Sequence, residues 1–165
     1  MSKLAFIALG SNQGDSRRLV RRAMESLQAL SDEALLKSSL WQTIPVDCPP
    51  GSPMFINAIV GLFPRPGETP ESLLEKLQSL EREFGRTPKK VRNEPRPLDL
   101  DLIVFGPEVR DTPEFTLPHP SAHLRRFVLQ PLHEIAPGLV LPGQTKTVAE
   151  LLDGLPVGER VTRLS

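Results

Sequence analysis

Two carboxylates lie two residues apart on an otherwise apolar segment, residues 98–102 (LDLDL). Strands disfavour Asp, whereas the Ile, Val and Phe that follow are typical of them. Because alternate strand residues share a face, Asp99 and Asp101 are expected to project together, roughly 6–7 Å apart. Mg²⁺ binds through one or two carboxylates plus substrate phosphates, and two ions can share such a pair. The alternative is a sheet with one wet face, the more common explanation for an isolated pair.

A basic segment precedes the carboxylates. Residues 86–96 carry Arg86, Lys89, Lys90, Arg92 and Arg96. Guanidinium groups bind phosphate oxygens through paired hydrogen bonds, so beside a metal-binding pair they indicate a polyphosphate substrate. A solvated run of charge is the alternative interpretation. The chain has no G-x-x-x-x-G-K-[ST] motif, which excludes a P-loop enzyme.

Length and composition limit the function classes. A chain of 165 residues suggests one domain over residues 1–165. The 20 basic and 20 acidic residues, one Trp and no Tyr argue against a nucleic-acid partner. No apolar run approaches the ~20 residues that cross a bilayer, and the single Cys excludes an internal disulfide. We expect a soluble, cytoplasmic monomer without a membrane partner.

Hydrophobic patterning predicts the order β-α-β-β-α-β with C-terminal additions. Strands are expected at 4–9, 35–43, 55–62, at the two Asp residues and, as a short tail, near 139–142; helices are expected at 16–30, from Thr69 to Gly85 and around 121–135. This order is typical of a ferredoxin-like α+β fold, a largely antiparallel sheet with helices on one face. Residues 10–15 (GSNQGD) are interpreted as a structural turn, with an anion-binding nest as the alternative. The long loops 44–53 and 86–97 are interpreted as functional.

Seven segments add a family resemblance. They are ALGSNQGD, WQTIPV, FINAIVGL, LEREFGR, PRPLDLDLIVFG, LPHP and RRFVLQPLHEIAP, in that order and over roughly residues 4 to 140. Together they resemble the 6-hydroxymethyl-7,8-dihydropterin pyrophosphokinases of folate biosynthesis. Members of that family transfer the β,γ-diphosphate of ATP to a reduced pterin, release AMP and use two Mg²⁺ ions. The resemblance therefore implies ATP as co-substrate and a pterin as the second small-molecule substrate.

The resemblance also implies roles for individual residues. Asp99 and Asp101 would bind the metal ions and act in catalysis with Arg86 and Arg96. Nucleotide contacts are implied for Gln78, Glu81, Arg92, Arg96, Leu102, Thr116, His119 and Arg125. Pterin contacts are implied for Thr43, Ile44, Val46, Phe55, Asn57 and Phe127, with the two Phe rings enclosing a flat ring whose polar rim meets Asn57. Without the resemblance, both Phe residues would be assigned to the core, and Asn57 would be assigned equally well to a backbone partner or to the rim of a ligand.

Two other functions stay open from the residues alone. One is a different two-metal nucleotide-processing enzyme, such as a hydrolase, which would have no use for a pterin platform. The other is a non-catalytic binding module on the same fold, which would bind nucleic acid in a metal-independent and salt-sensitive way. The balanced charge and the Asp pair argue against this second function.

Overall fold

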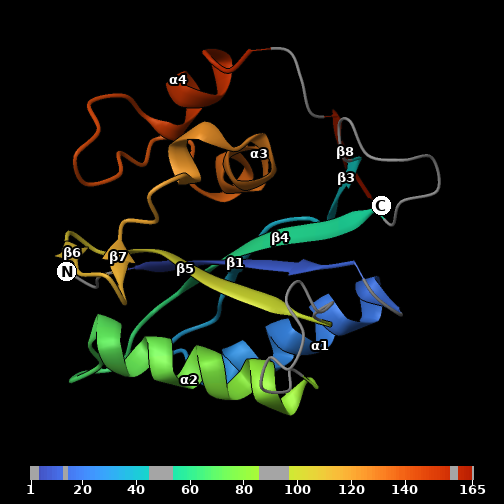
Figure 1. The fold of residues 1–165 in the computed structure, drawn as a ribbon, viewed down its shortest axis with the longest axis vertical. Helices are drawn as coiled ribbons and strands as arrows, with labels where there is room; N and C mark the ends of the chain where they lie inside the picture. The colour runs from blue at the N-terminus through green and yellow to red at the C-terminus, as the bar shows by residue number, and fades with distance from the viewer. Residues whose placement is uncertain (1–3, 13–14, 45–53, 86–96, 157–159, 165) are drawn as a thin grey trace.

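One antiparallel sheet separates two layers of helices (Figure 1). The computed structural model describes residues 4–12, 15–44, 54–85, 97–156 and 160–164. Its elements are β1 (Ala5–Ser11), α1 (Ser16–Gln28), β2 (Leu36–Lys37), β3 (Trp41–Ile44), β4 (Phe55–Leu62), α2 (Pro70–Glu83), β5 (Asp99–Phe105), β6 (Arg110–Asp111), β7 (Thr116–Leu117), the 3₁₀ turn η1 (Ala122–Leu124), α3 (Arg126–Ile135), α4 (Val148–Asp153) and β8 (Arg160–Arg163). No helix in these ranges is long and apolar enough to cross a membrane.

The ferredoxin-like α+β architecture is confirmed. The described strands of the main sheet follow the order β5-β1-β4-β3-β8, with β2 also paired to β4, and every pair is antiparallel. Helices α1 and α2 cover one face, as expected, whereas α3 covers the other and α4 packs on α3 (Figure 1). The C-terminal additions therefore bury a face that the sequence analysis had left without helices.

The C-terminal region contains the main error of the sequence-based prediction. Residues 139–142 form no strand; Leu141 is 2% exposed and packs in the same apolar cluster as α3, and the carbonyl of Leu139 accepts the Val148 N–H at 2.8 Å. The last strand of the sheet is instead β8, which pairs with β3. Its sequence, RVTR, lacks a hydrophobic pattern because its residues are half-buried or exposed at the sheet edge.

Two predicted elements are interrupted. The strand expected at 35–43 is split into β2 and β3 around Ser38, whose hydroxyl donates to the Ser39 carbonyl at 2.8 Å and accepts the Ile59 N–H at 2.9 Å. Serine hydroxyls that bind the backbone in this way compete with regular strand pairing. The helix expected around 121–135 is likewise divided into η1 and α3.

Local sequence explains where the first two helices begin. The Asp15 carboxylate accepts the Arg18 N–H at 3.3 Å and caps α1. At the start of α2, Thr69 and Ser72 form a reciprocal capping box, and Pro70 is the first residue of the helix. Gly85 follows α2 with a φ of +100°, a conformation that favours glycine and ends the helix. The helix that faces β5 thus has sequence-encoded limits at both ends.

Alternation along β1 and β5 builds a core on each side of the sheet. In β1, Ile7 and Leu9 pack into the cluster that includes α1 and α2, and Phe6 packs into the cluster with α3. Leu98, just before β5, and Leu100 and Leu102 within it are at most 5% exposed and belong to the first cluster, as predicted. Asp99 and Asp101 must therefore project toward the face that α3 covers.

A carboxylate on α3 ties that helix to the sheet. Glu134 accepts hydrogen bonds from the Ser39 N–H at 2.8 Å, the Ser39 hydroxyl at 2.6 Å and the Trp41 indole N–H at 2.9 Å. Desolvation raises the pKa of Glu134, but these hydrogen bonds, with the nearby Arg163 charge, outweigh it and hold the pKa below its ordinary value. The ionised form is therefore the form that fastens α3 to the segment before β3.

We predict that Glu134→Gln lowers the free energy of unfolding by roughly 1 kcal/mol at pH 7, because the amide loses the charge that strengthens these bonds and keeps one acceptor oxygen for three donors at a largely exposed site. A carboxyl with a depressed folded-state pKa stabilises the fold above its unfolded pKa, and this contribution disappears as pH falls through the folded value. The difference, measured by urea denaturation, should therefore be smaller at pH 3 than at pH 7. Glu114→Gln, at an exposed loop carboxylate, is the control; an equal deficit at both pH values would contradict the prediction.

Candidate active site

Strand register places polar side chains from β4 and β5 around a floor of small residues. Asn57 on β4 pairs with Gly10 on β1, and Gly10 pairs with Asp99 on β5. One step along, Ala8 pairs with Asp101. Directly paired residues share a face, so the amide and the two carboxylates project on the same side. The small side chains between them leave that side open.

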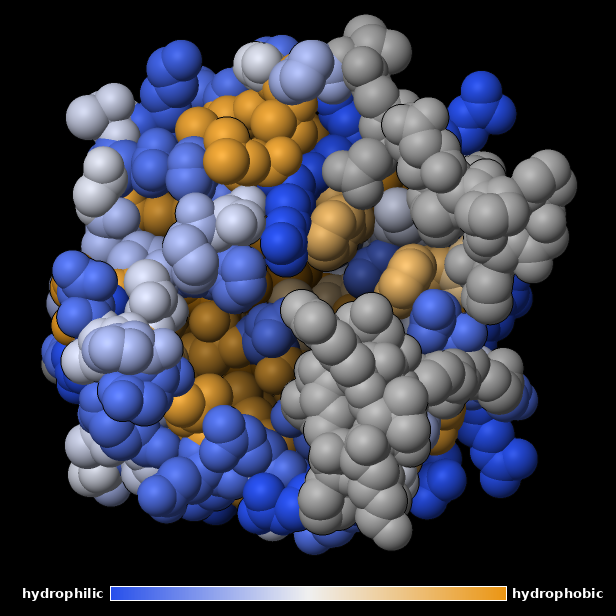
Figure 2. All heavy atoms as spheres, viewed as in Figure 1, coloured by the Kyte–Doolittle hydropathy of each residue, from blue (hydrophilic) through white to orange (hydrophobic). Residues whose placement is uncertain are grey.

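A pocket of about 310 Å³ lies on this floor, at the lower end of the range for small-molecule sites. It is lined by Ala8, Leu9, Gly10, Thr43, Phe55, Asn57, Ala58, Asp99, Asp101, Ile103, His119, Arg125, Phe127 and Val128. Figure 2 shows this face of the molecule hollowed near its middle, with hydrophobic and hydrophilic side chains side by side around the opening. Phe55 is 38% exposed, which is unusual for a large apolar ring and suits a ligand contact.

A hydrogen bond fixes the orientation of the Asn57 amide. The Thr43 hydroxyl, on a residue that is 5% exposed, donates to Asn57 Oδ1 at 2.8 Å. The partner is therefore a side chain rather than the backbone group considered in the sequence analysis. A Cβ at Gly10 would lie 3.2 Å from Asn57 Nδ2, closer than ordinary contact. Thr43 and Gly10 together keep the amide NH₂ group on the pocket floor.

His119 and Arg125 form the opposite wall. The backbone N–H of His119 donates to the Ile103 carbonyl at 2.8 Å, and the backbone N–H of Ser121 donates to the ring atom Nδ1 of His119 at 3.2 Å. Burial lowers the pKa of His119; the Asp101 charge raises it and the Arg125 charge lowers it further, for a net decrease. The neutral ring thus predominates at pH 7, with Nδ1 as acceptor and the proton on Nε2. The Arg125 guanidinium lies 5.5 Å from the centroid of the Phe127 ring.

The structure brings most of the sequence-predicted residues that it describes to this pocket: Thr43, Phe55, Asn57, Asp99, Asp101, His119, Arg125 and Phe127. Gln78 on α2 and Thr116 on β7 are exposed and do not line it. The Leu102 side chain is in the core on the far side of the sheet, and Glu81 is buried against β5. Val46, Arg86, Arg92 and Arg96 lie outside the described residues, and Ile44 is described only by its backbone. The roles of these residues stay predictions.

Sequence reasoning missed the residues that form the floor and back of the pocket. Ala8, Gly10 and Ala58 are small, and Leu9, Ile103 and Val128 are ordinary core residues by type. Gly10 was assigned to the turn at 10–15, but it and Ser11 belong to β1. Only the pairing of β1 with both β4 and β5 could have indicated that this glycine lies between Asn57 and Asp99.

The Asp pair suits a cation that brings other ligands with it. Asp99 is half-buried, Asp101 is exposed, and both line the pocket. Within the described ranges, no group of three or more His, Cys, Asp or Glu side chains could hold a metal ion. Two carboxylates without a third protein ligand fit Mg²⁺, which completes its shell with water and phosphate oxygens.

Comparisons with known proteins identify the family of the chain. The family model of 7,8-dihydro-6-hydroxymethylpterin-pyrophosphokinase (HPPK) matches residues 6–137. A 2-amino-4-hydroxy-6-hydroxymethyldihydropteridine pyrophosphokinase of Pseudomonas aeruginosa is 35% identical over 99% of this chain and 98% of its own. A Bacillus subtilis protein of the same name is 39% identical over 82% of this chain and 79% of its own.

Solved structures show the same fold. The crystal structure of an HPPK-DHPS in complex with substrates has a TM-score of 0.68 at 11% identity and covers 92% of this chain. Plasmodium falciparum HPPK-DHPS with pteroate has a TM-score of 0.67 at 13% identity and covers 93%. This chain spans less than half of those two proteins, 43% and 42% of their lengths.

We predict that the pKa of His119, followed by proton NMR in metal-free buffer, lies below the ordinary value of about 6.5. Arg125→Gln should raise this pKa because it removes a nearby positive charge, and Asp101→Asn should lower it because it removes a negative one. Arg126→Gln, on the next residue but not among those that line the pocket, is the control. Identical titrations in all variants would show that these charges do not act on His119.

Proposed function

Because the chain belongs to the 7,8-dihydro-6-hydroxymethylpterin-pyrophosphokinase family, we propose that it transfers the β,γ-diphosphate of ATP to the hydroxymethyl group of 6-hydroxymethyl-7,8-dihydropterin and releases AMP. As a pyrophosphokinase, it acts in folate biosynthesis. One structural observation carries the proposal: the carboxylates of Asp99 and Asp101 line the same pocket as Asn57 and two aromatic rings. A diphosphate donor and a flat ring acceptor could therefore meet there.

The pterin would bind between β4 and α3. Phe55, at the start of β4, and Phe127, in the first turn of α3, would stack on its faces. Asn57 would donate its amide N–H groups to acceptors on the pterin rim. Thr43 would keep that amide in a single orientation, since its hydroxyl already occupies one lone pair of Oδ1. A site that hydrogen-bonds a polar rim rejects ligands that lack it.

Asp99 and Asp101 would hold two Mg²⁺ ions together with the phosphates of ATP. Bound there, Mg²⁺ would neutralise charge on the phosphates and acidify the attacking hydroxyl group. Carboxylate oxygens are the ligand type that Mg²⁺ prefers, and both carboxylates lie on one face of a rigid strand. Their position beside Asn57 and Gly10 would bring the β-phosphate near the hydroxymethyl end of the pterin.

In the proposed transfer, the hydroxymethyl oxygen attacks the β-phosphorus in line, and the bond from that phosphorus to the α,β-bridging oxygen breaks. AMP leaves with the bridging oxygen, and the hydroxyl proton is released. The chain mainly positions groups and balances charge. His119 would donate its Nε2–H to a phosphate oxygen, and Arg125 would add positive charge on the same wall.

The remaining roles rest on the resemblance. Arg86 and Arg96 would stabilise charge on the transferred group, and Arg92, Gln78 and Thr116 would contact the nucleotide. Val46 and Ile44 would touch the pterin edge. A single domain over residues 1–165, a monomeric state and a cytoplasmic location likewise stay predictions.

Nucleotide product analysis tests the proposed reaction. We expect AMP, not ADP, to form only when ATP, Mg²⁺ and the dihydropterin are all present. Asp101→Asn should lower kcat by roughly 10²-fold or more because it removes one of the two carboxylates that would hold the Mg²⁺ ions on the phosphates. Asp111→Asn, an exposed carboxylate on β6, is the matched control. AMP formed without pterin would indicate a hydrolase, and ADP would indicate a different kinase; either result would overturn the proposal.

A second prediction concerns the aromatic wall. Phe127→Leu should raise KM for the dihydropterin about five- to tenfold, since a ring–ring contact is worth about 1 kcal/mol, and should leave KM for ATP nearly unchanged. Steady-state kinetics with each substrate varied in turn would measure both constants. Phe63→Leu, just beyond β4 and not among the pocket residues, is the control. Equal increases in KM for the dihydropterin and KM for ATP would argue against a pterin contact.

A further inference from the structure

Glu81 is a buried carboxylate that the pocket does not use. It lies on the last turn of α2 and is 4% exposed, the one ionisable residue among the described residues classed as buried. It does not line the pocket. Burying a charged or polar carboxyl group without partners is strongly unfavourable, so its position has to be explained by what it binds.

Glu81 binds the backbone of β5. Its Oε2 accepts the Leu100 N–H at 2.9 Å, a hydrogen bond that is buried. Strand β5 lies at one edge of the described sheet, and its neighbour in the sheet is β1. In an antiparallel pair, every second N–H points away from the neighbouring strand, so an edge strand leaves these donors unpaired. Glu81 supplies the acceptor for one such donor.

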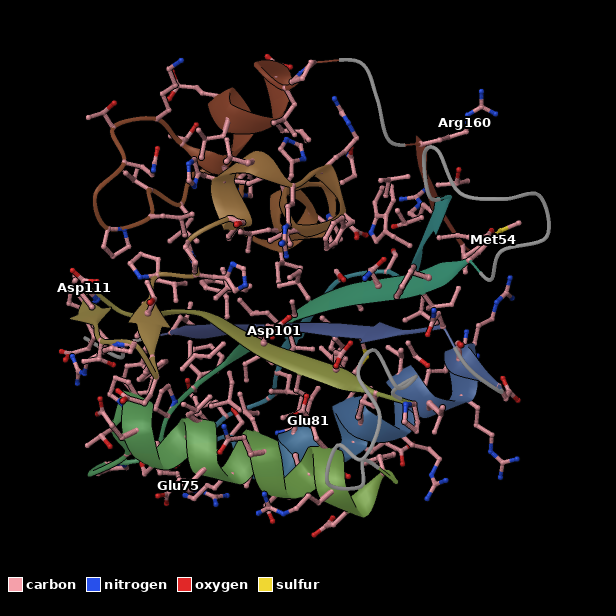
Figure 3. All side chains as sticks on the ribbon, viewed as in Figure 1. Met54, Glu75, Glu81, Asp101, Asp111 and Arg160 are labelled. Atoms are coloured by element: carbon pink, nitrogen blue, oxygen red, sulfur yellow. The ribbon has the colours of Figure 1, made fainter. Side chains whose placement is uncertain are left out.

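The donor that Glu81 holds lies between the two proposed metal ligands. Leu100 separates Asp99 from Asp101 and directs its own side chain, 4% exposed, into the core. Figure 3 shows Glu81 pointing from α2 toward β5, the strand that carries Asp101. The bond therefore holds the central residue of the Asp-Leu-Asp unit from the side opposite β1.

We propose that Glu81 is a positioning residue that holds the Leu100 peptide so that Asp99 and Asp101 keep the spacing needed to share metal ions. The inference rests on the proposed function, because it takes both Asp residues as metal ligands. It gives Glu81 a role through β5, in place of the direct nucleotide contact that the resemblance implied. Its burial and its backbone partner support this role.

The expected size of the effect follows from other metal sites. Groups that orient metal ligands without touching the metal typically change metal affinity or activity by about 10- to 100-fold when they are removed. Metal-ligand geometry is sensitive to shifts of about 0.5 Å. Near Leu100, the described strand that pairs with β5 is β1, so this part of the strand can move by that amount if the Glu81 contact is lost.

Binding of Mn²⁺ measured by electron paramagnetic resonance tests the proposal. Each protein is titrated in the presence of α,β-methylene-ATP, an analogue that cannot be cleaved at the α,β bridge. We expect Glu81→Ala to weaken protein-dependent Mn²⁺ binding about tenfold. Glu81→Gln should recover most of that loss, because its amide oxygen can accept the same Leu100 hydrogen bond.

Two control variants separate this role from others. Asp101→Asn should abolish the protein-dependent binding if the Asp pair holds the metal. Leu80→Ala, at a partly buried position on the same helix, should lower the melting temperature and leave Mn²⁺ affinity unchanged. If wild-type protein showed no Mn²⁺ binding, the proposed metal role of the Asp pair would fail, a result distinct from failure of the Glu81 inference.

Binding of AMP in EDTA distinguishes positioning from a nucleotide contact. A positioning role predicts the same AMP affinity in wild type and Glu81→Ala, whereas a direct contact predicts a weaker one. The inference is overturned if Glu81→Ala binds Mn²⁺ as tightly as wild type, or if Leu80→Ala weakens Mn²⁺ binding as much as Glu81→Ala does. Equal losses in Glu81→Ala and Glu81→Gln would assign the effect to charge and would also overturn positioning through the hydrogen bond.

Discussion

The alternation of β5 is the constraint on which the site depends. Leu98, Leu100 and Leu102 are buried against the layer of α1 and α2, and burial of each leucine stabilises the fold by about 1.5–3 kcal/mol. A shift of one residue in register would turn these leucines to the other face and bury the carboxylates, so the fold resists it. The hydrophobic core therefore sets the direction of Asp99 and Asp101. The geometry of the candidate metal site is thus a consequence of core packing.

The pocket is assembled across the sheet from segments far apart in the chain. Strand β1 supplies the small residues Ala8 and Gly10, and its two neighbours supply the polar groups on either side of them. Each polar group is held by a second residue: Thr43 fixes the Asn57 amide, and Glu81 binds the backbone between the two Asp residues. Such supporting contacts allow a site to keep its geometry before a ligand arrives.

The second helical layer completes the pocket and joins it to the rest of the fold. Phe127 lies in the first turn of α3 and Glu134 in its last, so one short helix carries both a pocket wall and the carboxylate that fastens it to the β2–β3 segment. The helix also buries Val128, Leu129 and Leu132 against the sheet. Because the wall is part of a packed helix, its position relative to Asn57 is set by tertiary contacts.

The sequence by itself determined the order of elements from β1 to β5, the limits of α2 and the shared face of Asp99 and Asp101, because these depend on local periodicity and on neighbouring residues. The seven segments that resemble the pyrophosphokinases also led to the family, and with it to Phe55, Asn57 and Phe127. Only the tertiary structure decided that Gly10 separates Asn57 from Asp99, that Glu81 binds Leu100 and that β8 closes the sheet beside β3. These features depend on strand register and on contacts between distant segments, and neither is encoded in the residue types of any one segment.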